Sequence, residues 1–147
     1  MDILDQIRED HEQVNDTLEE LIQGGGGRGK QSASISKLRG ALLSHAKAEE
    51  AVLYPPSMEN DEARAHMLKA VEEHHVIEMV LGAIGEGADD QERTVAKLSV
   101  LRDIVEHHVD EEESETFDFA HEMFEDEELD EMGERFMKEK EKRMARA

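Results

Sequence analysis

The chain has 147 residues, of which 37% are hydrophobic and 37% are charged, and its formal net charge is −21. This length fits one domain, and the charge argues against nucleic acid and anionic membranes as partners, because both would repel so acidic a chain. The absence of cysteine excludes disulfide scaffolds, thiolate metal sites, iron–sulfur clusters and cysteine nucleophiles.

The first third of the chain predicts two helices, because apolar residues recur there every three or four positions. Glycines at 24–27 and Gly29 are expected to end the first helix and open a flexible loop. The second helix is expected to start near residues 32–36 and to stop at Pro55 and Pro56. The predicted inward stripes are Leu4, Ile7, His11, Val14, Leu18 and Leu21, and then Ile35, Leu38, Leu42, His45, Glu49 and Val52.

The same rhythm predicts a third helix over residues 61–84, closed by Gly85 and Gly87, and a fourth that begins at residues 89–94. A fifth, highly charged helix from about residue 126 is expected to lie along the others as a cap. The predicted inward residues are Met67, Ala70, His74, Ile77, Leu81 and Ile84 in the third helix, Leu98, Leu101, Val105, His108 and Glu112 in the fourth, and Leu129, Met132 and Phe136 in the fifth.

No segment alternates like a strand, so we expect an all-α fold: an up-down-up-down four-helix bundle over residues 1–120 and a charged C-terminal capping helix within residues 121–147. The two halves of the bundle also repeat each other. A shift of 63 positions places His11 on His74, His45 on His108, and Glu49 on Glu112. This repeat implies a nearly two-fold arrangement of the four helices.

Each of the four stripes carries one histidine near its middle, and two of these histidines are followed by a glutamate four residues later. Residues four apart share a helix face, so the bundle should bring these side chains to one level of its core. Two buried carboxylates cost several kcal/mol each unless a cation offsets them, and every lysine and arginine falls off the stripes. A pair of divalent metal ions would offset that cost. The predicted metal-binding residues are His11, His45, Glu49, His74, His108 and Glu112.

Imidazole nitrogens and carboxylate oxygens form a ligand set suited to iron or manganese, and zinc also accepts such ligands. Two carboxylates shared between two metals, with two imidazoles on each metal, leave coordination positions open for a small ligand. Within the histidine doublets, the stripes select His74 over His75 and His108 over His107.

The combined pattern resembles the hemerythrin-like, HHE cation-binding family over roughly residues 1–120. The segments that carry the resemblance are DHE at 10–12, HAKAEEAVLYP at 45–55, EHHVI at 73–77 and HHVDEEE at 107–113. In that family the bundle holds a non-heme di-iron centre bridged by two carboxylates and an oxo or hydroxo group. The resemblance implies that four histidines are terminal ligands and two glutamates are bridging ligands, namely His11, His45, His74 and His108, with Glu49 and Glu112.

One position departs from the oxygen-carrying members, which have a second histidine four residues after the one on the third helix. Here that residue is Glu78, either a weak ligand or a solvent-facing side chain, and the repeat matches it to Asn15. A site with four histidines is more symmetric and more open. The resemblance therefore favours oxygen or peroxide chemistry, sensing or iron handling over reversible oxygen carriage.

Several other residues are expected to be structural. His66 and His121 are predicted to be surface residues, and the glutamates at 111–113 and 125–128 to be solvated apart from Glu112. Tyr54 and Phe117, which the repeat relates, are expected to pack at helix ends. A redox role for Tyr54 is the alternative.

The expected function is a di-iron protein that binds, senses or processes oxygen, peroxide or nitric oxide. The alternatives are an iron storage or binding module without turnover, and a metal-free acidic bundle that engages a basic partner. We expect a monomer or a homodimer whose ligand is a diatomic molecule or peroxide. The N-terminus has no basic region followed by an apolar core, and no apolar run approaches the roughly 20 residues of a membrane span, so we expect a cytoplasmic protein.

Overall fold

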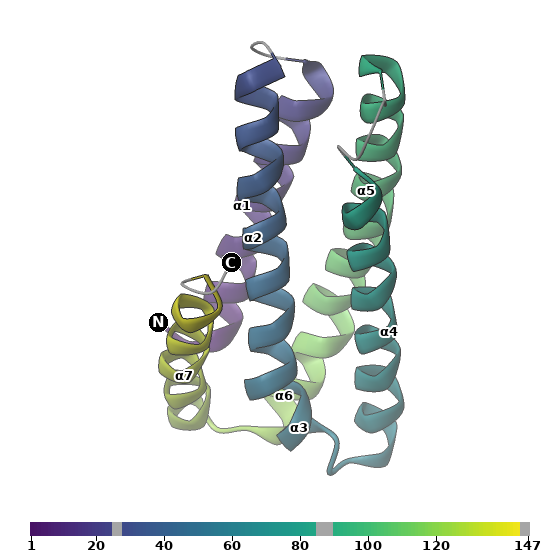
Figure 1. The fold of residues 1–147 in the computed structure, drawn as a ribbon. Helices are drawn as coiled ribbons and strands as arrows, with labels where there is room; N and C mark the ends of the chain where they lie inside the picture. The colour runs from purple at the N-terminus through teal and green to yellow at the C-terminus, as the bar shows by residue number, and fades with distance from the viewer. Residues whose placement is uncertain (25–27, 85–89, 145–147) are drawn as a thin grey trace.

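The computed structural model describes residues 1–24, 28–84 and 90–144, and no β-strand occurs in these three segments. Four long helices run alternately up and down side by side (Figure 1). The predicted four-helix bundle with an additional C-terminal helix is confirmed. The bundle helices are α1 (Ile3–Gln23), α2 (Arg28–Val52), α4 (Asp61–Ala83) and α5 (Gln91–Glu111); the other elements are α3 (Tyr54–Ser57), the π-helical turn η1 (Glu112–Thr116), α6 (Phe117–Met123) and α7 (Asp126–Met144).

Short polar side chains begin three of the bundle helices. The Asp2, Asn60 and Asp90 carboxylate or amide oxygens accept hydrogen bonds from the backbone N–H groups three residues later, at 2.9, 3.1 and 2.8 Å. These bonds satisfy N–H groups that have no partner in the first helical turn. At the other end of α1, Gly24 adopts a left-handed conformation with φ of 75°, which a residue without a Cβ adopts at little cost.

The second helix begins earlier than the sequence predicts, because α2 starts at Arg28 and includes Gly29. Glycine and serine disfavour a helix by less than about 1 kcal/mol each, so burial of residues further along the helix outweighs them. The predicted stop is confirmed: α2 ends at Val52, and Pro55 and Pro56 lie in the first turn of α3. The predictions for residues 25–27, Gly85 and Gly87 lie outside the described residues.

The predicted inward stripes are buried in all five helices. Their apolar members form two clusters, one at each end of the bundle. The cluster toward the chain termini includes Ile7, Val52 and Met67, and the cluster at the loop end includes Val14 and Leu81. The histidines and glutamates of the stripes occupy the layer between the two clusters, where water is excluded from both sides.

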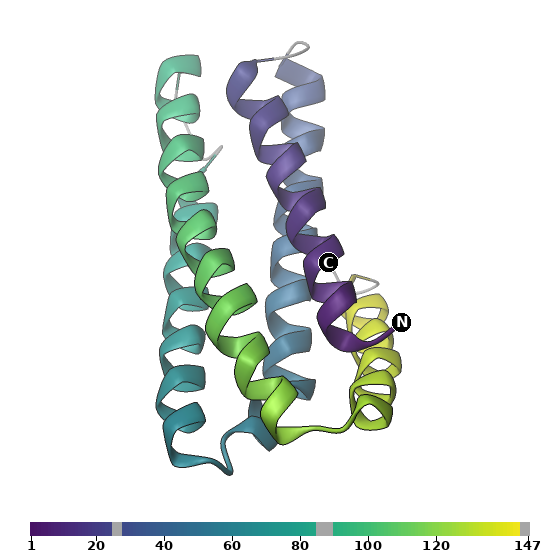
Figure 2. The same cartoon turned by 180° about the vertical axis from the view of Figure 1, so that it is seen from behind.

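Helix α7 packs against α1 and α2, beside the N-terminus (Figures 1 and 2). The Gln6 side-chain amide donates hydrogen bonds to the Gly133 carbonyl at 2.9 Å and the Met1 carbonyl at 3.0 Å. A Cβ atom at Gly133 would collide with the Met1 carbonyl oxygen, so the close approach of the two segments requires glycine. The apolar edge of α7 is buried as predicted, at Leu129, Met132 and Phe136.

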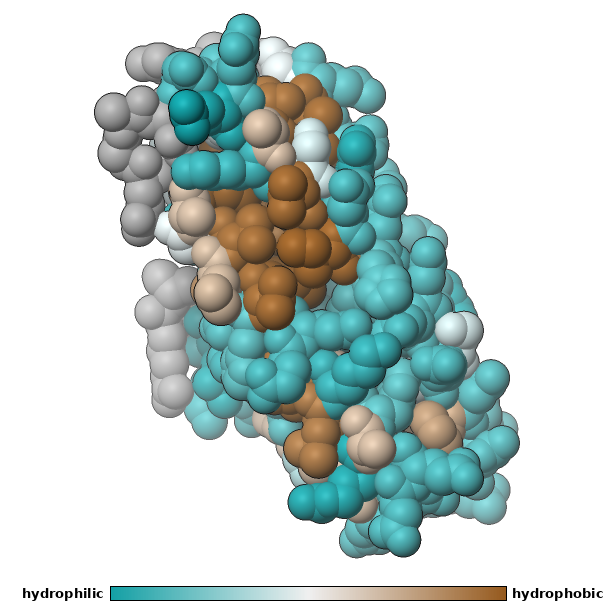
Figure 3. All heavy atoms as spheres, turned by 90° about the vertical axis from the view of Figure 1, so that its right-hand side faces the viewer, coloured by the Kyte–Doolittle hydropathy of each residue, from teal (hydrophilic) through white to brown (hydrophobic). Residues whose placement is uncertain are grey.

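The opposite side of the bundle has an apolar surface. Brown side chains gather there over α4 and α5 (Figure 3). Four large apolar side chains of these helices are exposed to solvent: Leu68, Val76, Met79 and Val100. In the described part of the chain, no helix combines the length and the apolar character that crossing a membrane requires.

Candidate metal centre

The six side chains singled out by the sequence meet in the layer between the two apolar clusters. Each of the four histidines is at most 7% exposed, and the two glutamates are at most 1% exposed. They divide into two groups of three residues whose ligand atoms lie within 4.8 Å of one another. The structure therefore brings all six together, and it arranges them as two half-sites rather than one.

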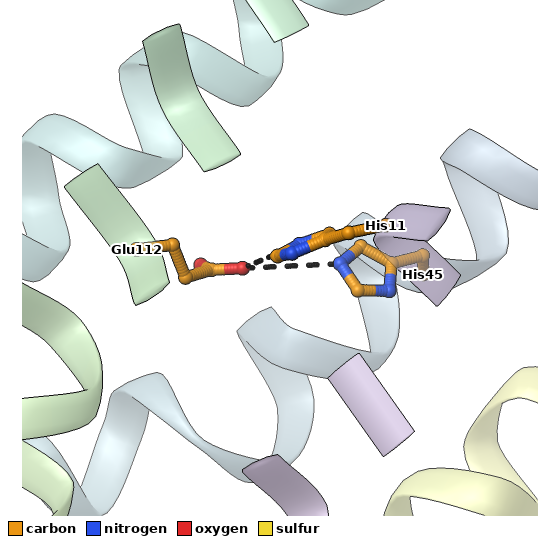
Figure 4. A group of neighbouring side chains, drawn as sticks. All are labelled: His11, His45 and Glu112. Atoms are coloured by element: carbon orange, nitrogen blue, oxygen red, sulfur yellow. Dashed lines mark hydrogen bonds and ion pairs between the residues drawn. The ribbon is translucent and has the colours of Figure 1, made fainter. Parts of the chain in front are cut away.

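The first half-site joins three elements. His11 of α1, His45 of α2 and Glu112 of η1 form it, with Glu112 Oε1 lying 3.1 Å from His11 Nε2 and 3.9 Å from His45 Nε2. Figure 4 shows the carboxylate directed at both imidazole rings. The π-helical turn contributes to this placement, because the N–H of Phe117 donates to the carbonyl of Glu112 five residues earlier. This turn buries both Glu112 and Phe117.

The second half-site consists of His74 of α4, His108 of α5 and Glu49 of α2. Glu49 Oε1 lies 3.2 Å from His74 Nε2 and equally 3.2 Å from His45 Nε2 of the first half-site. Glu112 Oε2 in turn lies 3.7 Å from His108 Nε2. Each carboxylate thus faces imidazoles of both half-sites, which is the arrangement that a bridging ligand requires.

Each imidazole is oriented by a carboxylate on a neighbouring element. Their Nδ1–H groups donate hydrogen bonds of 2.7 to 2.8 Å, which leaves every Nε2 facing the centre. The pairs are His11 with Glu113, His45 with Asp10, His74 with Glu50, and His108 with Glu73. The orienting role of these four acids was not predicted from the sequence. The signal was present, because each is adjacent to a predicted ligand and the shift of 63 relates Asp10 to Glu73 and Glu50 to Glu113.

Tyr54 also belongs to the centre. Its hydroxyl donates to Glu112 Oε2 at 2.8 Å, and its ring stacks on His74 with centroids 5.6 Å apart. Burial, together with the nearby carboxylates of Glu112 and Glu49, raises the Tyr54 pKa well above its ordinary value, so the hydroxyl keeps its proton. Tyr54 is buried at a helix end, as predicted, but its hydrogen bond to Glu112 was not predicted. The repeat places Phe117 at the equivalent position, where the hydroxyl is absent.

The carboxylates make the centre hold protons when no metal is bound. Burial alone lowers the pKa of His74, but Glu49 and Glu50 outweigh burial and raise this pKa from 6.5 to about 9. Burial also opposes charge on His45, yet Glu49 and Asp10 raise its pKa well above the ordinary value. For Glu112 burial raises the pKa, but contacts with Glu49 and two imidazoles hold it well below the ordinary range. A metal ion bound there would therefore compete with protons for the same atoms.

The buried atoms fit metal ions better than they fit one another. Both carboxylate oxygens of Glu49 are buried without a hydrogen bond, and so is His45 Nε2, although these groups lie 3.2 Å apart. The Nε2 atoms of His74 and His108 face each other at 3.2 Å, where two neutral rings that donate through Nδ1 would oppose their lone pairs, so a proton or a metal ion must lie between them. Such an arrangement is costly without a cation. Imidazole and carboxylate ligands suit divalent iron, manganese and zinc, so the residues fit one ion in each half-site.

A small apolar cavity adjoins the centre. It has a volume of about 30 Å³, roughly that of one or two water molecules, and its lining includes all four histidines of the centre and the side chains of Val14, Leu42, Ile77, Val105 and Val109. A more open groove of about 310 Å³ between α1 and α5 shares His11, Val105 and Val109 with this cavity. The cavity admits only a ligand of very few atoms.

The remaining histidines and glutamates test the finer predictions. His75, His107 and His121 are exposed, as predicted. The prediction that His66 is a surface residue is wrong, because its side chain is 13% exposed and its Nε2 lies 2.6 Å from Thr116 Oγ1. Glu78 lies 3.9 Å from Lys47 and belongs to neither half-site.

The prediction for the acidic runs is correct at one run and wrong at the other. Residues 125–128 are exposed, as predicted. Glu111 and Glu113 are only 23% and 30% exposed, so the prediction that both are solvated is wrong. Glu113 is drawn inward because it accepts the hydrogen bond from His11, whereas Glu111 pairs with the exposed Lys69 at 2.9 Å.

Comparison with known proteins agrees with this geometry. Residues 2–120 match the family model described as the hemerythrin HHE cation-binding domain, and α7 lies beyond the matched region. The comparisons with curated proteins and with solved structures returned no match. The family match covers most of the chain and contains all six residues of the centre. The chain therefore belongs to the hemerythrin HHE cation-binding domain family.

Proposed function

We propose that the buried centre holds two iron ions and that the protein binds, senses or processes dioxygen, peroxide or nitric oxide there. The proposed ligands are His11, His45 and Glu112 for one ion and His74, His108 and Glu49 for the other, with both glutamates bridging. Iron held in this way would supply open coordination positions and redox chemistry toward a small molecule. Manganese and zinc accept the same ligands, so metal analysis is part of the test.

The observation that carries the proposal is the set of four imidazoles whose Nε2 atoms converge on two buried carboxylates. The four Nδ1 hydrogen bonds hold these rings in place before any ligand arrives. The oxygens of Glu49 add to the argument, because when no metal is bound only protonated imidazoles such as His45 and His74 can offset this buried carboxylate.

The chain's own residues favour a small ligand. The cavity beside the centre has apolar walls that include Ile77 and Val105, so it excludes bulk water and larger substrates. On the other side of the histidines, the Tyr54 hydroxyl supplies a proton donor hydrogen-bonded to Glu112. A site with a dry pocket and one buried donor suits a diatomic molecule or peroxide.

Iron storage or transfer without turnover is the second candidate. The groove between α1 and α5 favours it, because Glu106 and Asp110 line the opening that leads to His11. Carboxylates there would attract a divalent cation toward the centre. Peroxide consumption by the iron-loaded protein that is absent in Glu49→Ala supports processing, whereas iron uptake without peroxide consumption supports the second candidate.

The decisive experiment loads the metal-free protein with ferrous iron under anaerobic conditions and counts the iron that remains bound after desalting. We expect two ions per chain, and near-ultraviolet bands of a ferric pair once air is admitted. His74→Ala should lose iron, whereas His75→Ala, an exposed neighbour of the same type, should retain both ions. Less than one ion per chain in the unmodified protein would overturn the proposal and support a metal-free acidic bundle.

A further inference from the structure

The four carboxylates that orient the histidines are not equally supported by cations. Lys140 Nζ donates to both oxygens of Asp10, at 2.8 and 3.0 Å, while Asp10 Oδ2 accepts from His45 Nδ1 at 2.8 Å. The corresponding distances are longer elsewhere: Lys47 Nζ lies 3.6 Å from Glu50, and Arg8 Nε lies 3.6 Å from Glu113. Asp10 is therefore held by a cation more firmly than Glu50 or Glu113 is.

Burial strengthens this difference. The Lys140 side chain is 22% exposed and Asp10 is 15% exposed, whereas Lys47 and Arg8 are 35% and 48% exposed. Exposed ion pairs at such distances contribute little, because water and salt screen them. A short charge-assisted pair that is mostly buried restricts both side chains. Lys140 thus fixes the position of Asp10, and Asp10 fixes the His45 ring.

Helix α7 supplies a second contact to the same histidine. The fully buried Phe136 ring lies edge-on to the His45 ring, with centroids 5.7 Å apart, and Lys140 Nζ lies 5.2 Å from the Phe136 centroid. The helix packs on α1 and α2, which carry His11 and His45 (Figure 2). On the α4 and α5 side, which carries His74 and His108, apolar side chains remain exposed instead (Figure 3).

We propose that Lys140 is a positioning residue that, through Asp10, makes the half-site of His11, His45 and Glu112 the tighter of the two metal sites. This inference rests on the proposed function, because it concerns the metal ions of the same centre. It also gives a role to α7, which lies outside the region matched by the family model. A fixed imidazole loses less freedom when it binds a metal, and loss of such outer support lowers metal affinity about 10- to 100-fold.

The test measures the dissociation constants of both ferrous ions by anaerobic competition with a chelator. The unmodified protein should show one tighter and one weaker ion. Lys140→Met should weaken the tighter ion about 10-fold, the lower end of the loss expected when a direct outer partner of a ligand is removed, and leave the weaker one unchanged. Lys140→Arg keeps the charge and the hydrogen-bond donors, so it should retain most of the difference between the two dissociation constants. Lys47→Met is the matched control in the other half-site and should change neither constant more than about threefold.

A second variant and a second signal separate positioning from a general loss of structure. Asp10→Asn removes the acceptor charge without changing side-chain shape, and it should weaken the same ion as Lys140→Met. Cobalt(II) absorption of the protein loaded with one cobalt ion should change in both variants and not in Lys47→Met, because only the first half-site is distorted. Helical circular dichroism should be the same in all variants.

The outcomes distinguish this inference from the function on which it rests. If the unmodified protein takes up less than one ion, the proposed metal centre is wrong and the inference falls with it. If the protein binds two ions and both Lys140→Met and Asp10→Asn leave the two constants unchanged, the metal centre stands and only the role of Lys140 is overturned.

Discussion

At the scale of single residues, each imidazole is paired with an outer carboxylate, and this pairing sets the pH at which its Nε2 atom gains or loses a proton. The Nδ1 bond directs Nε2 inward, where the inner carboxylates favour a proton in the metal-free protein and, on the proposed function, would favour a metal ion. In the metal-free protein this proton is part of the stability of the fold. The centre therefore links pH, metal binding and folding through the same nitrogen atoms.

Metal-free protein should lose stability as the pH rises above neutrality. The His74 pKa is about 9 in the folded protein and 6.5 in the unfolded chain, so its contribution is complete below pH 6.5 and disappears as the pH rises through 9. The shift corresponds to about 3 kcal/mol. Denaturant unfolding of the metal-free protein at pH 6 and pH 9.5 measures this loss. A free energy of unfolding that is equal or higher at pH 9.5 would contradict the assignment.

At low pH, the stability of the metal-free protein depends on carboxylates. The pKa values of Glu50, Glu73 and Asp10 are lowered, although burial opposes ionisation of each, because their histidine partners are close. Their contribution to stability is present above the ordinary carboxyl pKa and is lost as the pH falls below it. The metal-free protein should therefore be most stable in weakly acidic to neutral solution.

The Tyr54 hydroxyl gives a second prediction at this scale. Tyr54→Phe removes the donor to Glu112 and leaves a buried carboxylate oxygen with one fewer hydrogen bond. We expect the metal-free variant to unfold with about 1 to 3 kcal/mol less free energy, because a buried charged acceptor loses its partner. Urea denaturation of the metal-free proteins measures this difference. Unchanged stability would mean that this bond does not form in solution.

The sequence predicted the inner residues of the centre but not the residues that orient them. The six residues of the centre were found because helical spacing and the repeat both select them. The outer acids Asp10, Glu50, Glu73 and Glu113 were not found, because each orients a histidine of another element and so depends on how the helices pack. His66 was missed for the same reason, since its partner Thr116 is 50 residues away.

At the scale of elements, the turn η1 and the helix α7 modify an otherwise regular bundle. The π-helical turn begins at Glu112, where the fourth helix reaches the centre. Such turns are rare overall and are frequent at functional sites. Here the inward burial of Glu112, Thr116 and Phe117 accompanies it. Helical spacing alone continues the regular helix, so the sequence did not predict this turn.

The close contact of α7 with the N-terminus predicts that a substitution at Gly133 lowers the stability of the protein, whereas the same substitution at a control glycine raises it. Gly133→Ala should destabilise the protein by about 1 to 3 kcal/mol, because the new methyl group meets the Met1 carbonyl and the Gln6 amide. Gly40→Ala, inside α2 with open space around it, should instead stabilise by up to about 1 kcal/mol. Thermal and denaturant unfolding measure both. Equal effects of the two substitutions would contradict the described packing of α7.

At the scale of the whole molecule, two nearly equivalent hairpins enclose a centre that is not fully symmetric. The shift of 63 predicted the equivalence, and the burial of both histidine pairs agrees with it. The sequence could not predict which residues share a half-site, because each glutamate is grouped with the two histidines of the other hairpin. Glu49 is grouped with His74 and His108, and Glu112 with the histidines of α1 and α2. Tyr54 and α7 make the halves different, because the repeat places Phe117 where the other half has the Tyr54 hydroxyl, and because α7 packs on α1 and α2.

Anomalous X-ray diffraction at the iron edge from crystals of the iron-loaded protein tests the central claim most directly. We predict two peaks inside the bundle, one among His11, His45 and Glu112 and the other among Glu49, His74 and His108. The surface group Glu73, His107 and Glu111 serves as an internal comparison and should show no comparable peak. An empty interior, or iron at the surface group alone, would contradict the account.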